Sequence, residues 1–199
     1  KDKIKDKRVL DIPCGSGIYS NLFYELGAKE VVGIDISEEM VKLAKQKTKC
    51  PNSSFIQCDA QKLNDLSLDK FDIITCIFLF NYAKNEEELE NMIKNLKNLL
   101  NENGILLIFN DNILQSDYTT DYSRYNFTKS CENKIIKYHV FNNISNFDII
   151  NYKIDSNIFF QKFQKYFKEI TIHKLKVKDK DEYYNVFFNN QPFIFLTCK

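Results

Sequence analysis

Hydrophobic positions follow two different patterns along this chain. Short apolar runs at 9–12, 30–35, 54–59, 71–79 and 104–109 predict buried strands. Between them, helical spacing of apolar residues predicts helices at about 19–26, 37–46 and 86–100. Ser37 is the expected N-cap of the second helix, and Asn103-Gly104 is expected to close the third. This alternation predicts an α/β fold, with a parallel sheet and helices on both faces.

The second half of the chain is less regular. A polar, tyrosine-rich stretch covers 110–130, and alternating segments at 135–141 and 147–154 predict an added hairpin within 135–154. A final helix is expected over 156–167. With 199 residues and no Pro/Gly/Ser-rich linker, we expect a single domain over 1–199.

Composition narrows the classes of partner. The formal net charge of +1 gives no strong field toward nucleic acid or an anionic membrane. No apolar run approaches the roughly 20 residues of a membrane-spanning helix. Six widely separated cysteines indicate reduced thiols in a cytoplasmic protein. Only His139 and His173 are histidines, so no metal site is predicted, and His173 is given no role.

The loop after the first strand carries the strongest chemical signal. In the segment 8–20, RVLDIPCGSGIYS, the strand ends at an acid, and Gly15 and Gly17 follow. Glycines at this sheet edge let the backbone approach a ligand closely. A dinucleotide motif needs a third glycine, but Ser20 stands there, which disfavours a nicotinamide-dependent dehydrogenase. Two glycines alone are also compatible with a plain loop.

Two later strands also end in acids. Asp35 follows Gly17 by eighteen residues, a distance that suits a carboxylate accepting from both ribose hydroxyls. Asp59 ends the third run, and the N–H of Ala60 could face a flat base. Each acid alone is commonly a helix cap. Three acids at successive strand ends favour a cofactor site.

Taken together, the D-x-P-C-G-S-G loop, Asp35, Asp59-Ala60 and the run 71–74 resemble the class I S-adenosylmethionine-dependent methyltransferases over nearly the whole chain. The resemblance implies a Rossmann-like seven-stranded sheet in the order 3-2-1-4-5-7-6. Its last two strands would be 169–177 and 192–198, with the final strand antiparallel. Residues 1–109 would form the cofactor-binding half, and 110–199 the substrate side.

The resemblance also assigns roles to residues. Asp11 and the Cys14–Gly17 loop would hold the methionine moiety, Asp35 the ribose, and Asp59 with Ala60 the adenine edge. Further residues expected beside the cofactor are Pro13, Tyr19, Ile36, Met40, Cys76 and Ile77. Pro13 departs from the family pattern, which has a glycine there. The implied cofactor is S-adenosylmethionine, with S-adenosylhomocysteine as product.

The methyl acceptor is expected to be a small molecule. Asn81-Tyr82 lacks the prolines of the base-gripping Asn/Asp-Pro-Pro-Tyr motif, so the resemblance leans toward quinone-pathway and toxoflavin-type enzymes. An aromatic wall for a planar or cationic acceptor, or else a packing cluster, is expected from Tyr118, Tyr122, Tyr125 and Phe127.

Candidates for proton removal are Asp111, one of these tyrosines and His139, for which a solvated pairing role is favoured. An acceptor that is already nucleophilic needs no base. A silent cofactor-binding subunit and a protein or RNA methyltransferase remain alternatives, and the oligomeric state is open.

Overall fold

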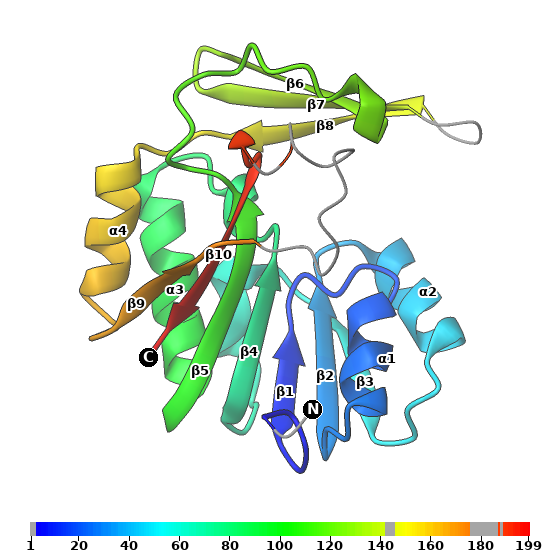
Figure 1. The fold of residues 1–199 in the computed structure, drawn as a ribbon. Helices are drawn as coiled ribbons and strands as arrows, with labels where there is room; N and C mark the ends of the chain where they lie inside the picture. The colour runs from blue at the N-terminus through cyan, green and yellow to red at the C-terminus, as the bar shows by residue number, and fades with distance from the viewer. Residues whose placement is uncertain (1–2, 142–145, 176–186, 188) are drawn as a thin grey trace.

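The main sheet has seven strands in the order β3-β2-β1-β4-β5-β10-β9 (Figure 1). A computed structural model describes residues 3–141, 146–175, 187 and 189–199. The strands are β1 (Arg8–Asp11), β2 (Glu30–Asp35), β3 (Ser53–Gln57), β4 (Phe71–Ile77), β5 (Leu100–Asp111), β9 (Ile170–His173) and β10 (Phe193–Cys198). The first five are parallel, and β10 is antiparallel to both neighbours. The predicted strand order is confirmed; residues 176–177 of the predicted sixth strand lie outside the described residues.

Helices cover both faces of this sheet (Figure 1). The helices α3 (Glu86–Leu99) and α4 (Ser156–Gln164) pack on the face that carries Leu10 and Ile74. On the opposite face, α1 (Ile18–Glu25) packs through Phe23, and α2 (Glu38–Lys47) packs through Val41. None of these helices in the described parts of the chain has the length and apolarity that crossing a bilayer requires.

The helix boundaries agree with the prediction at one end and differ at another. Ser37 caps α2 as predicted, because its Oγ accepts from the N–H of Met40 at 3.2 Å. The expectation that Asn103-Gly104 closes α3 is wrong. The helix ends at Leu99, and both residues lie inside β5, because Leu100 already pairs with Phe71 of β4.

A second, three-stranded antiparallel sheet lies above the carboxyl ends of the main strands (Figure 1). It consists of β6 (Phe127–Glu132), β7 (Ile135–Phe141) and β8 (Asn146–Tyr152). The predicted hairpin corresponds to β7 and β8, whereas no strand is predicted over β6, most of which falls in the polar, tyrosine-rich stretch. Phe127, Lys129 and Cys131 share one face of β6, and the lysine interrupts the apolar alternation that would have identified the strand.

The loop after β1 lies directly on β2 because Gly33 has no side chain. A Cβ at Gly33 would stand 2.4 Å from the Phe55 ring and 3.1 Å from the Cβ of Cys14. The N–H of Cys14 donates to the carbonyl of Ile34 at 2.9 Å. This close approach places the glycine loop beside the end of β2, where Asp35 is found. Three short 3-10 helices, η1 (Ala60–Asp65), η2 (Phe80–Tyr82) and η3 (Ser123–Tyr125), complete the connections.

Candidate functional site

A cleft opens at the carboxyl ends of β1, β2, β3 and β4. Its lining includes eight of the residues predicted to bind a cofactor, namely Pro13, Gly15, Asp35, Ile36, Met40, Asp59, Ala60 and Ile77. Phe78, Leu79, Tyr82 and Met92 close its other side. Residues from four separate strand ends therefore meet in one cavity, as expected for a ligand site in an open α/β sheet. We call this cavity the cofactor cleft.

Asp35 is held in the cofactor cleft by two backbone hydrogen bonds. Its Oδ2 accepts from the N–H of Gly15 at 2.8 Å, and its Oδ1 accepts from the N–H of Ser37 at 2.9 Å. Each carboxylate oxygen has a further lone pair, so the group can accept two more hydrogen bonds. The side chain that the sequence assigned to ribose is thus held in place before any ligand binds.

Asp59 and Ala60 sit at the end of β3. The Oδ1 of Asp59 accepts from the N–H of Gln61 at 2.9 Å and so caps η1. The capping role considered for this acid is present, and the second carboxylate oxygen remains for a ligand. Ala60 is held from behind, because its carbonyl accepts from Nδ2 of Asn95 at 3.1 Å.

Asp11, by contrast, lies behind the cofactor cleft rather than in its lining. Its side chain is fully buried and accepts from Oγ of Ser20 at 2.6 Å and from Oγ1 of Thr75 at 3.1 Å. These contacts fasten the start of α1 to β1 and β4. In the present geometry Asp11 therefore shapes the glycine loop from below.

Four other predicted residues also lie outside the lining. Cys14 packs with Val41 and Phe55 under α2, and Cys76 is fully buried in the main core. Gly17 is the N-cap of α1 with φ 80°, and a Cβ there would stand 3.2 Å from the Cβ of Ala44. Tyr19 lines a separate apolar cleft, beside Phe23, Leu107, Phe109 and Phe195 on the α1 face of the sheet.

Burial of Asp11 leads to a pH prediction. Desolvation raises the pKa of this carboxyl from its ordinary value of 3.8 to about 6, against the hydrogen bonds from Ser20 and Thr75. The folded state therefore binds the proton more tightly than the unfolded state, and this contribution to stability is lost as the pH rises from 3.8 through about 6. At about 1.4 kcal/mol per pKa unit, the loss amounts to roughly 3 kcal/mol.

Asn at this position cannot ionise, so we expect the Asp11→Asn variant to lose less stability than the parent over this pH range. Urea unfolding of both proteins between about pH 4 and pH 7 measures the difference in slope. Parallel pH profiles would show that Asp11 does not titrate with a raised pKa.

A second cavity lies between the three-stranded sheet and the segment that follows β4. Six rings contribute to its lining, from Phe78, Tyr82, Tyr125, Phe127, Tyr138 and Phe193. Phe78 and Tyr82 line the cofactor cleft as well, so the two cavities adjoin. We call the second cavity the aromatic pocket.

Two of the four predicted wall residues belong to the aromatic pocket, Tyr125 and Phe127. Tyr122 has a packing role instead: it is fully buried, stacks on Phe127 at 5.1 Å and donates its hydroxyl to the carbonyl of Asn190 at 2.6 Å. Tyr118 lines a smaller cavity behind the pocket. Phe78, Tyr138 and Phe193 were not singled out from the sequence, because only the fold brings their distant segments together.

Phe78 stands at the junction of the two cavities in an unusual backbone conformation. Its φ is 64°, which costs a non-glycine residue about 1–3 kcal/mol. Its N–H donates to the carbonyl of Phe109 at 2.7 Å, and its ring meets Phe109 and Phe193 edge-on at 5.3 Å each. These contacts hold the ring between cofactor cleft and aromatic pocket.

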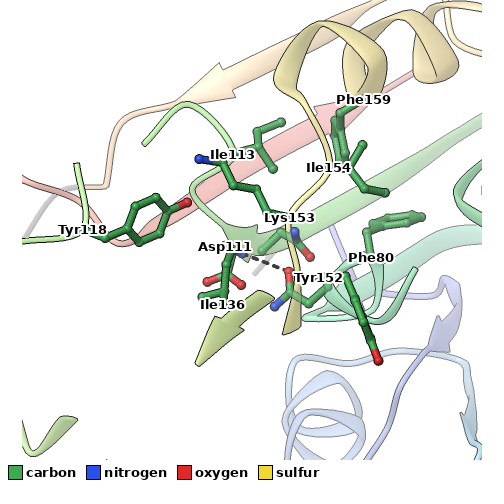
Figure 2. A pocket seen from close by; sticks show the side chains of 11 residues that line it. Phe80, Asp111, Ile113, Tyr118, Ile136, Tyr152, Lys153, Ile154 and Phe159 are labelled. Carbon is green, nitrogen blue, oxygen red and sulfur yellow. Dashed lines mark hydrogen bonds between the residues drawn. The ribbon is translucent and has the colours of Figure 1, made fainter. Parts of the chain in front are cut away.

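A buried polar network lies behind the aromatic pocket and is centred on Asp111. The Tyr138 hydroxyl donates to Oδ1 of Asp111, and Nδ2 of Asn151 donates to Oδ2 at 2.8 Å. Nζ of Lys129 lies 3.5 Å from Oδ1, with both side chains almost completely buried. Figure 2 shows Asp111 together with Tyr118 and Lys153 around the small cavity. Burial lowers the pKa of Lys129, while the Asp111 charge opposes that shift.

The candidates for proton removal are placed differently. Asp111 lies behind Tyr138 and lines neither the cofactor cleft nor the aromatic pocket. Burial and the Asp111 charge raise the pKa of the Tyr138 hydroxyl well above its usual range, so it is a hydrogen-bond donor at neutral pH. His139 is on the outer face of β7 and pairs with Asp148 at 2.8 Å. His173 contacts Thr197 in the main sheet, away from both cavities.

Comparison with known proteins bears directly on the cofactor cleft. Residues 9–104 match the model of a family described as a methyltransferase domain. The matched segment, just under half of the chain, is similar to a methyltransferase domain. It contains every residue that lines the cofactor cleft, whereas most of the aromatic pocket lies beyond it.

Relatives of the chain are found by sequence and by structure. A ubiquinone biosynthesis O-methyltransferase of Glaesserella parasuis is 34% identical over 108 residues, which cover 51% of this chain and 44% of that enzyme. The chain thus spans less than half the length of this relative. An S-adenosylmethionine-dependent methyltransferase of Mesorhizobium loti has a TM-score of 0.68 at 13% identity, covering 98% of this chain and 92% of that chain.

A second structural relative, an S-adenosylmethionine-dependent methyltransferase of Clostridium acetobutylicum, has a TM-score of 0.64 at 19% identity. The match covers 96% of this chain and 83% of that chain. At these identities the likeness establishes the fold. The strand order of the main sheet and its antiparallel strand β10 follow the Rossmann-like methyltransferase pattern.

Proposed function

We propose that this protein transfers a methyl group from S-adenosylmethionine to a small-molecule acceptor. The observation that carries the proposal is the cofactor cleft, in which Gly15, Asp35 and Asp59 come together inside the segment that is similar to a methyltransferase domain. Met40 and Met92 add apolar surface for a flat base. The acceptor class is supported by the adjoining aromatic pocket and by the missing prolines around Asn81-Tyr82.

The charges of the cofactor cleft fit this cofactor. Among the described residues that line it there are two carboxylates, Asp35 and Asp59, and no lysine, arginine or histidine. A pyrophosphate placed there would meet negative charge without a counter-charge, which is costly. S-adenosylmethionine carries a sulfonium, an ammonium and a carboxylate group, hence a net positive charge, and no phosphate, so the lining suits it better than it suits a dinucleotide.

The protein's own contribution to the reaction is positioning. When bound, the cofactor would supply a methyl group on a sulfonium: an acceptor lone pair forms the bond to the methyl carbon, the C–S electron pair returns to sulfur to give S-adenosylhomocysteine, and a proton on the acceptor atom is released to water. Asp35, held by Gly15 and Ser37, would orient the ribose, and Phe78 with Tyr82 would form the boundary between acceptor and cofactor. Orientation of two reactants can supply roughly 7–11 kcal/mol of the barrier. No base is required when the acceptor atom is already nucleophilic.

Calorimetric titration tests the cofactor assignment. We expect S-adenosylmethionine and S-adenosylhomocysteine to bind and NAD not to bind. Absence of S-adenosylhomocysteine binding would overturn the proposed function. Incubation with S-adenosylmethionine and a metabolite extract then separates an enzyme, which forms S-adenosylhomocysteine, from a silent binding subunit, which does not.

A further inference from the structure

The aromatic pocket is uncharged as well as apolar. Among the described residues of its lining, none is acidic or basic; the polar ones are three asparagines, Asn81, Asn126 and Asn151, and the tyrosine hydroxyls. The carboxylate of Asp111 is not part of the lining; it accepts from Tyr138 and Asn151 and is paired with Lys129. A charged ligand would therefore be desolvated here without a partner of opposite charge, which is unfavourable.

Aromatic rings can also attract a cation, but the cation position at this wall is already taken. Nζ of Lys129 lies 5.3 Å from the centre of the Tyr138 ring and 5.2 Å from that of Tyr118. The lysine thus occupies one π-face of Tyr138. Because Lys129 and Asp111 are paired with each other, neither supplies a counter-charge to an ion in the pocket, and a flat neutral molecule needs none.

The ring geometry favours a flat ligand. Tyr138 and Phe193 are stacked with an interplanar angle of 20° and a centroid distance of 6.1 Å. Phe127 is tilted by only 33° from Phe193. Near-parallel rings on one side, and the edge-on Phe78 beside them, offer both stacking and edge contacts to an aromatic molecule.

Two carboxamides of the lining each keep one buried polar atom without a partner among the described residues. Nδ2 of Asn151 donates to the Asp111 carboxylate, which leaves Oδ1 of Asn151 buried without a partner. Oδ1 of Asn81 accepts from the N–H of Asp111 at 3.3 Å, which leaves Nδ2 of Asn81 without one. Asp111 fixes both amide orientations: its carboxylate must accept from the NH₂ group of Asn151, and its backbone N–H must donate to the carbonyl oxygen of Asn81. Buried polar groups of this kind are normally paired.

We propose that the aromatic pocket binds an uncharged, planar molecule. This inference rests on the proposed function, because it makes that molecule the methyl acceptor. The location, next to the cofactor cleft across Phe78 and Tyr82, allows both ligands to be bound at once.

Three naphthalene derivatives test the ligand class: naphthol, which is neutral, naphthoate, which is an anion, and naphthylmethylammonium, which is a cation. Each is titrated by calorimetry into the protein saturated with S-adenosylhomocysteine. We expect naphthol to bind. Both charged compounds are expected to have a Kd at least about tenfold higher, which corresponds to about 1.4 kcal/mol of binding free energy. Equal or tighter binding of either ion would overturn the inference.

Neighbouring residues of β8 test the location. Ile149 lines the aromatic pocket, whereas Ile150 is exposed on the opposite face of the same strand. We expect the Ile149→Trp variant to lose naphthol binding and to retain S-adenosylhomocysteine binding, and the Ile150→Trp variant to retain both. Val140→Trp, which also fills the pocket, repeats the test from β7, with thermal unfolding as the check of folding.

The outcomes separate the two proposals. Naphthol binding that survives both pocket-filling substitutions in folded protein would overturn the proposed location. Naphthol binding that is lost in both supports it. If the parent protein binds naphthol in this pocket but does not bind S-adenosylhomocysteine, the proposed function fails while the pocket and its ligand class stand.

Discussion

Replacing Asp35 by alanine is expected to weaken the binding of S-adenosylhomocysteine by about 3 kcal/mol, a roughly hundredfold rise in Kd. The carboxylate is the group to which we assign the two ribose hydroxyls, and hydrogen bonds to a charged acceptor are stronger than neutral ones. The same substitution removes the acceptors for the N–H groups of Gly15 and Ser37, so the glycine loop keeps its bond from Cys14 to Ile34 but loses the one from Gly15. Isothermal titration calorimetry measures the change.

The Asp35→Asn variant is the matched comparison, because its single side-chain oxygen keeps half of the accepting capacity. We expect it to bind with an affinity between the parent and Asp35→Ala. Thermal unfolding of the unliganded proteins shows how much of the loss comes from the loop. Unchanged affinity in Asp35→Ala would refute the ribose assignment.

Replacing Lys129 by methionine is expected to lower the free energy of unfolding by about 3–5 kcal/mol. Methionine has a similar length and fills the space, but it leaves the Asp111 carboxylate buried without a counter-charge. It also leaves the Oε1 of Gln115 and the carbonyl of Pro192 without the donor they now share, at 2.8 and 3.0 Å. Urea denaturation monitored by tyrosine fluorescence or circular dichroism measures the loss.

A double-mutant cycle isolates the charge pair. Lys129→Met combined with Asp111→Asn is expected to cost less than the sum of the two single substitutions, because the uncompensated charge is gone. Lys137→Met serves as the surface control, since its ion pair with Asp148 is about half exposed, and it should change the stability little. Strict additivity in the cycle would show that the pair does not couple.

The cofactor half of the molecule could be predicted well from the sequence, for a physical reason. Strands buried on both faces are continuous apolar runs, and each acid at such a run's end marks the sheet edge where ligands bind. Asp35 and Asp59 follow this rule and meet in the cofactor cleft. Asp11 follows the same sequence rule, yet its side chain is turned into the core, because an unbroken apolar strand carries no signal of which face its last residue takes.

The acceptor side was harder to predict because long-range contacts define it. Lys129 lies at a buried position of β6, where it pairs with Asp111 of β5. The sequence around either residue does not indicate this pairing. Phe193 joins the aromatic pocket from the last strand, far along the chain from Phe127. The sequence did indicate an aromatic wall. It did not indicate that Tyr122 is buried behind Phe127, whereas Tyr138 lines the pocket.

The two cavities share Phe78 and Tyr82, but most of their lining comes from different parts of the chain. The cofactor cleft uses residues 12–92, whereas seven of the residues that line the aromatic pocket fall between Tyr125 and Asn151, after β5 and before α4. Under the proposed function, exchange of that stretch is expected to change the acceptor that is bound while the cofactor cleft stays intact. Chimaeras joined in the loops on either side of the three-stranded sheet would therefore separate acceptor specificity from cofactor binding.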